Sequence, residues 1–266
     1  KDVTGVSISE VSATANSANA LFSGKNHSYV SNANLDIAGA VELSAESCSF
    51  ARGDVMQDSK LGLVSLFLTE IYAYAGGDFG SYVSNSTGKK VKGKSVNISN
   101  TYTARAKSMS AQSDSGIDAS LVSAGANVAL AHTRVTSKAG ISGGEAEANQ
   151  TSEEGDIQVS LTGNAKAEAS FYGPLAKLSA ANLAVNFVEA RLLDQQDAYI
   201  KDATVTAYDV SVYSSFNESD RQVAASAIIA GGGQGGGGSL SVSGISINTN
   251  TAIADAASKV TSLIEN

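Results

Sequence analysis

The residue types best suited to chemistry gather in one acidic stretch, SGGEAEANQTSEEGD, at residues 142–156. Its carboxylates are Glu145, Glu147, Glu153, Glu154 and Asp156. Carboxylate oxygens on a loop can hold Ca²⁺, but this spacing matches no EF-hand loop, and an acidic insertion with glycines is typical of a solvated loop. We therefore expect no cofactor, with calcium as the alternative. Because loops on rigid scaffolds often carry recognition, these five residues form the candidate partner-contact loop.

A second charged stretch, RLLDQQDAYIKDA at residues 191–203, could hold an acid–base pair. Its charged residues are Arg191, Asp194, Asp197, Lys201 and Asp202. Paired carboxylates beside basic residues are typical of many polysaccharide lyases and hydrolases. The stretch recurs as NTNTAIADA with the single carboxylate Asp255, however, and a catalytic pair is not expected to follow a structural repeat. We predict that the chain is not an enzyme, and keep a polysaccharide-active β-helix enzyme as the alternative.

The glycine tract AGGGQGGGGS at residues 230–239 invites comparison with a phosphate-binding loop. Such a loop needs a Lys followed by Ser or Thr after its glycines, whereas Ser-Leu-Ser-Val follows here. His27 and His132 are far apart in the sequence, and neither lies near a second ligand type in the sequence. We therefore predict no catalytic site, no cofactor-binding site and no metal site.

Composition excludes several classes of protein. The formal charge of −8 argues against nucleic acid as a partner, because a phosphate-binding surface needs clustered Lys and Arg. The one basic cluster, GKKVKGK at residues 88–94, is expected to be a solvated loop. No apolar run approaches the roughly 20 residues of a transmembrane segment. One Pro, no Trp and only 17% charged residues indicate a thin core of small side chains.

The chain contains an internal repeat of a little over fifty residues. The motif SYVSN occurs at residues 28–32 and 81–85, and similar motifs surround single apolar residues further along the chain. We call the central apolar residue of each motif its anchor. The anchors are Val30, Val83, Ile141, Ile200 and Ile253, at spacings of 53, 58, 59 and 53 residues. Residues 61–77 also align with residues 119–135 at an offset of 58. Repeats of this period indicate a solenoid or an array, so we predict a single segment over residues 1–266, cut from a longer protein.

The runs that follow the anchors alternate apolar and polar residues, as in Val96 and Ile98 or Val159 and Leu161. This period of two is typical of strands with one buried face. The Ala-rich residues 178–193 could form a helix on propensity alone, but Leu183 also alternates with its neighbours, so strand is favoured. We predict an all-β fold, a parallel β-helix (β-solenoid) of four to five degenerate repeats. With roughly 20–25 residues per coil, each repeat would hold two or three coils, and the rod would be on the order of 60 Å long.

The repeated pattern resembles the repeat regions of bacterial filamentous adhesins, the leukotoxin-like and haemagglutinin-like large exoproteins. Residues 121–141, 180–202 and 235–256 carry the resemblance. It implies a right-handed β-helix stalk, secretion or display at the bacterial cell surface, and attachment to host or neighbouring cells. It transfers no catalytic residue to this chain.

The expected function is that of a structural or adhesive stalk segment. The expected partner is a receptor on a host or bacterial surface, either protein or glycan, and the solenoid is expected to continue into further repeats of the same chain. A segment of a leukotoxin-type secreted cytotoxin is an alternative, and so is an inert spacer without a ligand.

Overall fold

The computed structural model describes residues 7–57, 60–112, 117–151, 153–173, 176–218, 224–230 and 240–265. Every regular element in these ranges is a β-strand, and all strand pairs are parallel. Among the described residues there is no helix that could span a membrane. The predicted all-β fold is therefore confirmed.

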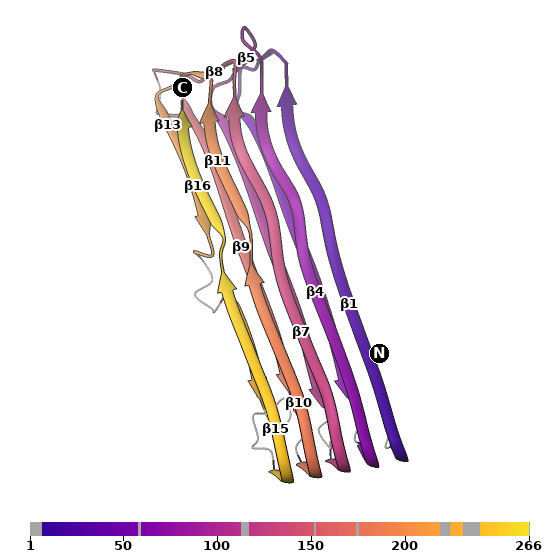
Figure 1. The fold of residues 1–266 in the computed structure, drawn as a ribbon. Helices are drawn as coiled ribbons and strands as arrows, with labels where there is room; N and C mark the ends of the chain where they lie inside the picture. Colours follow the sequence, from indigo (N-terminus) through magenta and orange to yellow (C-terminus); the bar gives the residue numbers. More distant parts are fainter. Residues whose placement is uncertain are drawn as a thin grey trace.

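The strands form three sheets (Figure 1). Sheet A contains β1 (Ser7–Ser31), β4 (Lys60–Ser84), β7 (Ile117–Ser142), β10 (Ala176–Leu192), β11 (Gln195–Lys201), β15 (Leu240–Ala256) and β16 (Lys259–Glu265). Sheet B contains the short strands β2 (Leu35–Asp36), β5 (Lys90–Lys92), β8 (Glu145–Glu147) and β12 (Thr204–Thr206). Sheet C contains β3 (Val41–Gln57), β6 (Val96–Gln112), β9 (Asp156–Tyr172), β13 (Asp209–Phe216) and β14 (Ala225–Ala230).

One repeat is one coil of a parallel β-solenoid. The chain rises along sheet A, crosses the upper end through sheet B, returns along sheet C and enters the next strand of sheet A (Figure 1). Val30 pairs with Val83, which pairs with Ile141, which in turn pairs with Ile200. The first four predicted anchors therefore stack directly on one another.

The predicted coil length was wrong. Hydrogen-bonded neighbours in sheet A lie 53 to 64 residues apart in the sequence, so each repeat holds one coil rather than two or three. Alternation alone does not reveal how long a strand runs before it turns. A strand as long as β1 extends about 80 Å, whereas the stack of coils is only about 20 Å deep. The long axis of the molecule consequently follows the strands (Figure 1).

The fifth anchor was also wrong. Ile253 pairs with Glu189, and the residue that stacks on Ile200 is Ile264. The register offset in sheet C rises from 53 at Ile157 and Val210 to 58 at Ala167 and Ala225. It reaches 64 between β10 and β15. Two insertions in this last coil thus displaced the anchor by eleven positions; most of the glycine tract lies outside the described residues.

The corner after each long strand depends on a few special residues. Asn32, Gly143 and Asp202 occupy equivalent places just past their anchors, and all three have positive φ, at 48°, 67° and 51°. Glycine adopts this left-handed conformation freely, and Asn and Asp tolerate it better than other residues. In the second coil, Asn85 instead holds the backbone of Ala33 through both side-chain atoms, at 3.1 and 3.2 Å.

The interior between sheets A and C changes character along the strands. The upper part is filled by large apolar residues such as Val83, Ile98 and Ile141, each at most 1% exposed. The middle part is a column of alanines, in which Ala73 and Ala131 are fully buried. In sheet A, one position is alanine on all five coils: Ala20, Ala73, Ala131, Ala190 and Ala254. Such small side chains allow the two sheets to approach closely.

The lower part of the interior is polar. Gln57 donates to the side-chain oxygen of Asn127 at 2.9 Å, Asn127 donates to Asn186 at 2.8 Å, and Asn186 donates to Asn250 at 2.8 Å. The first bond crosses the interior from sheet C to sheet A, and the other two run from coil to coil, parallel to the backbone ladder. Such amide ladders satisfy buried polar groups in stacked parallel strands.

Candidate functional site

The acidic stretch and the basic cluster meet in sheet B. The nitrogen of Lys90 lies 3.1 Å from Glu145 and 2.8 Å from Glu147, and Lys92 lies 3.0 Å from Glu147. Lys94 pairs with Glu154 in the same way. The cluster that was expected to be a solvated loop is therefore partly a strand, β5, in parallel pairing with β8.

These ion pairs are partly exposed to solvent, and they shift the pKa values of some of their members. Hydrogen bonds from Lys90 and Lys92 lower the pKa of Glu147, and the bond from Lys94 lowers the pKa of Glu154. Hydrogen bonds to Glu147 and then Glu145 raise the pKa of Lys90. Exposed pairs of this kind are screened by salt. Three carboxylates of the predicted partner-contact loop are thus engaged within the chain; its contact role stays a prediction.

Glu153 and Asp156 complete the predicted partner-contact loop. Glu153 is exposed in a turn, and Asp156 begins β9. Among the described residues, no group of three or more His, Cys, Asp and Glu side chains lies close enough together to hold a metal ion.

The second charged stretch divides between the inside and the outside of the solenoid. Asp194 is 1% exposed and accepts hydrogen bonds from the backbone of Val135 at 2.6 Å and the hydroxyl of Thr133 at 3.1 Å. Burial raises the pKa of Asp194 to about 6, against the opposing effect of these two bonds. Lys201 pairs with Glu265 at 3.5 Å. Asp194 is therefore an interior residue of the bend between β10 and β11.

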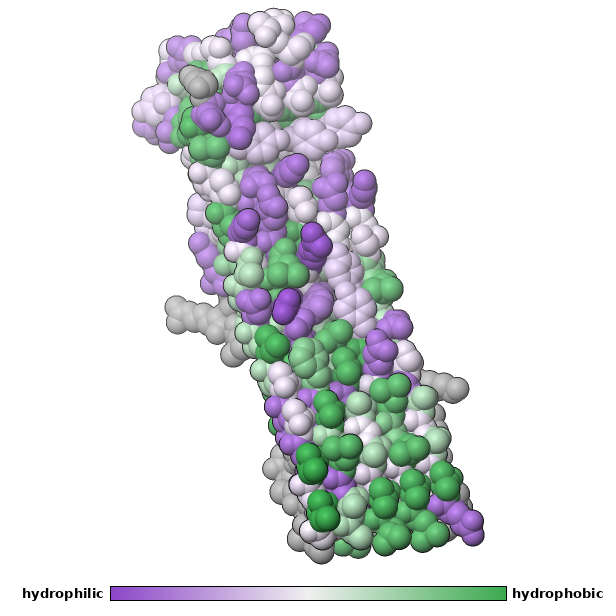
Figure 2. All heavy atoms as spheres, in the orientation of Figure 1, coloured by the Kyte–Doolittle hydropathy of each residue, from purple (hydrophilic) through white to green (hydrophobic). Residues whose placement is uncertain are grey.

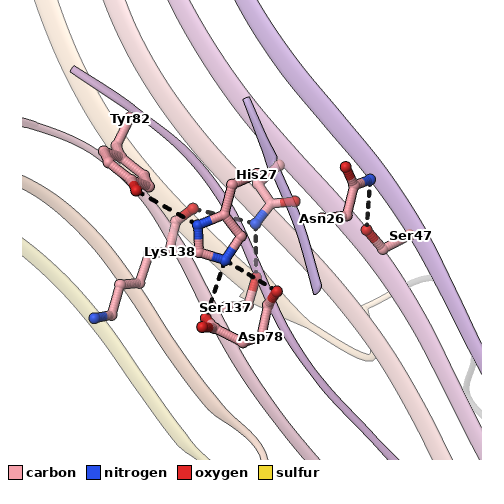
Figure 3. Close-up of polar contacts among 8 residues, drawn as sticks. Asn26, His27, Ser47, Asp78, Tyr82, Ser137 and Lys138 are labelled. Carbon is pink, nitrogen blue, oxygen red and sulfur yellow. Dashed lines mark hydrogen bonds and ion pairs between the residues drawn. The ribbon is translucent and has the colours of Figure 1, made fainter. Parts of the chain in front are cut away.

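The outer face of sheet A carries a polar cluster that the sequence did not reveal (Figure 3). One ring nitrogen of His27, Nδ1, lies 3.4 Å from the Tyr82 hydroxyl. The other, Nε2, lies 3.1 Å from the Asp78 carbonyl oxygen and 3.3 Å from its carboxylate. Tyr29 stacks on Tyr82 with ring centres 5.6 Å apart. The register offset of 53 places His27 opposite Gly80, so knowledge of that offset would have predicted the contact.

A row of tyrosines crosses this face. Tyr29, Tyr82, Gly140 and Tyr199 occupy one row on four successive coils. The Tyr199 ring covers Gly140, with ring atoms 2.6 to 2.7 Å from where a β-carbon would stand. Glycine at this position is therefore required for the ring to lie flat. Burial raises the pKa of Tyr199.

A second polar cluster lies lower on the same face. His132 contacts the carboxylate of Glu189 at 2.8 Å, and Arg191 contacts it at 3.1 Å. Tyr72 meets the His132 ring edge-on, with centres 5.5 Å apart. Each histidine thus contacts a carboxylate from the adjacent coil, Asp78 for His27 and Glu189 for His132.

A shallow groove of about 320 Å³ lies on this face. Gly24 and Gly77 contribute no side chains to it, and Lys25, Tyr74, Asp78 and Arg134 border it. Lys25 and Arg134 supply hydrogen-bond donors, Asp78 supplies an acceptor and Tyr74 supplies an aromatic ring. These groups suit a ligand rich in hydroxyl or amide groups, such as a glycan or a polar peptide.

Comparison with known proteins adds no relative: no protein-family model, no curated protein and no solved structure matches this chain. The parallel β-solenoid and its stacked repeats define the class of the fold.

Proposed function

We propose that this chain is a structural and adhesive stalk segment of a large bacterial protein that is secreted or displayed at the cell surface. The observation that carries the proposal is the outer face of sheet A, where equivalent positions of successive coils line up in rows. Tyr29, Tyr82 and Tyr199 form one such row beside the groove at Asp78 and Arg134. A rigid wall that presents contacts in rows suits weak, repeated binding to a surface receptor.

The mechanism is mechanical and multivalent. The backbone hydrogen bonds of the three sheets join every coil to its neighbours, so the wall keeps its shape when a ligand pulls on it. Single contacts through the groove are expected to be weak, because the groove is shallow and open. Several such contacts on one cell surface add through effective concentration, which raises overall avidity without any new contact. Further coils of the same chain, stacked on β1 or β15, would extend the wall.

The experiment compares binding of the chain to host cells, bacterial cells and immobilised glycans with binding of three variants. The groove variant combines Lys25→Ser and Arg134→Ser. Its matched control combines Lys107→Ser and Arg105→Ser, which remove the same charges from the outer face of sheet C. The loop variant combines Glu153→Gln and Glu154→Gln.

Saturable binding that the groove variant weakens, and the sheet C control retains, supports an adhesive segment and locates its contact surface. Loss of binding only in the loop variant would move the contact surface to the acidic loop. No binding by the folded parent chain to any surface would overturn adhesion and leave an inert spacer. Release of glycan fragments would instead favour the polysaccharide-active alternative.

A further inference from the structure

The outer face of sheet A is apolar in its lower half, as the green surface in Figure 2 shows. Three neighbouring outward rows cross all five coils, and we call them the apolar face. The rows are Val11, Val64, Val122, Ala181 and Ile245; Ala13, Leu66, Ala124, Leu183 and Ile247; and Ala15, Leu68, Ala126, Val185 and Thr249. Only Thr249 carries a polar group. Leu68 is 51% exposed, Leu183 is 50% exposed and Ile247 is 60% exposed.

The inner side of the same strands has the opposite polarity. Ser65, Ser123 and Asn127 alternate with the exposed residues, and each is at most 4% exposed. Because successive side chains of a strand point to opposite faces, the lower half of sheet A buries hydroxyl and amide groups and exposes aliphatic ones. Parallel sheets normally have both faces covered. An exposed apolar surface of this size on a soluble chain marks a contact site.

We propose that a second copy of this chain covers the apolar face. With strands about 4.8 Å apart and same-face side chains about 6.8 Å apart, the face measures about 24 by 20 Å in projection. Two such faces bury on the order of 1,000 Å² between them, which is the lower limit for a specific interface. The face is flat, uncharged and identical on both copies, so it is complementary to itself in a twofold arrangement.

The charges on the upper half decide the orientation. Lys25, Asp78 and Lys138 point outward from sheet A above the apolar face. Two copies with their strands aligned in the same direction would place these charges against each other and remove them from water. Two copies in opposite directions overlap only at their lower halves, and the charged upper halves project past each other. The dimer is therefore antiparallel, with the tyrosine rows at its two far ends. This inference does not depend on receptor binding.

The first test measures the oligomeric state of the chain by sedimentation velocity from about 1 to 100 µM. The interface variant combines Leu66→Lys and Leu183→Lys, at positions that are 44% and 50% exposed, so the fold should tolerate them. The control variant combines Phe50→Lys and Thr101→Lys, which remove an exposed aromatic ring and add the same charges on sheet C. We expect a dimer for the parent and the control, and dissociation at least about 100-fold easier for the interface variant.

The second test measures orientation. The single cysteine is removed by Cys48→Ser, and a spin label is attached through Leu130→Cys, six residues above the centre of the apolar face. In the antiparallel dimer the two labels lie about 40 Å apart, whereas strands aligned in the same direction would bring them within about 20 Å.

Three outcomes overturn the proposal: a parent chain that stays monomeric at 100 µM, a control variant that dissociates as easily as the interface variant, or labels within about 20 Å. Binding to neutral phosphatidylcholine vesicles tests whether lipid, rather than a second copy of the chain, occupies the apolar face. A monomeric chain that binds these vesicles, and loses binding in the interface variant, would show that lipid rather than a second copy covers the face.

Discussion

The buried carboxyl of Asp194 should make the solenoid less stable as the pH rises. Its pKa is raised to about 6 by burial, from a usual value of 3.8. Well below pH 3.8 the carboxyl is protonated in both the folded and the unfolded chain. Between pH 4 and pH 6 the unfolded chain loses this proton while the folded chain retains it. The free energy of the unfolded state therefore falls relative to that of the folded state. Stability therefore falls across this window and stays reduced above pH 6.

The magnitude follows from the two pKa values. A separation of this size corresponds to on the order of 3 kcal/mol of unfolding free energy. The substitution Asp194→Asn removes the ionisation but retains the geometry. Its side-chain oxygen can still accept from the backbone of Val135, and its amide can donate to the hydroxyl of Thr133. Stability that the wild-type chain loses on going from pH 4 to pH 7 should therefore be retained in the variant.

The assay is urea unfolding followed by circular dichroism, at intervals between pH 3.5 and pH 8. The stability difference between Asp194→Asn and the wild type should grow by up to about 3 kcal/mol in favour of the variant over this range. Asp197→Asn, three residues away on the outer face, controls for the loss of one negative charge. A difference for Asp194→Asn that stays flat with pH, or that matches the control, would refute the reasoning.

Two further predictions concern the interior. Asn186→Ala removes the central member of the amide ladder, so Asn127 loses its acceptor and Asn250 its donor; we expect a loss of about 1–3 kcal/mol in urea unfolding, and an unchanged midpoint would contradict the ladder. Gly163→Ala would place a β-carbon against the side-chain nitrogen of Gln196 and 2.6 Å from the Tyr102 ring, so it should destabilise the chain by about 1–3 kcal/mol. Adding Gln196→Ala removes the nearest neighbour and should recover part of that loss, and strictly additive losses would argue against the clash.

Strand periodicity and the repeat were the parts of the fold that could be predicted from sequence. Alternation at Val96 and Ile98 is a local property of a half-buried strand, and the repeat of Val30 in Val83 is a property of stacking. Coil length was not predictable in this way, because a strand of seven residues and one of seventeen alternate alike. The anchor Ile253 shows that sequence similarity alone does not give the register. The residues around Ile253 resemble those around Ile200, but the insertions in the last coil place Ile264 opposite Ile200 instead.

The candidate site was hidden for a related reason. His27 meets Asp78 and His132 meets Glu189 only because coils of 53 to 59 residues place them side by side. In the sequence each histidine is isolated. Likewise, the lysines of β5 and the glutamates of β8 were interpreted as separate loops until parallel pairing brought them together. Chemistry in a solenoid is assembled across coils, so it becomes visible only when the register is known.

The lower half of sheet A has polar residues on its inner side and apolar residues on its outer side, and this arrangement links the stability of the solenoid to its proposed dimerisation. In the upper part, Ile98 and Ile141 hold sheet C against sheet A by apolar burial. In the lower part, the bonds from Asn127 to Asn186 and from Asn186 to Asn250 hold coil against coil along the stack, and Gln57 of sheet C adds a bond across the interior to Asn127. Strands there no longer need aliphatic side chains on their inner side, and those side chains turn outward instead. A wall stabilised along its stacking direction can thus present its apolar face to another molecule without giving up its own fold.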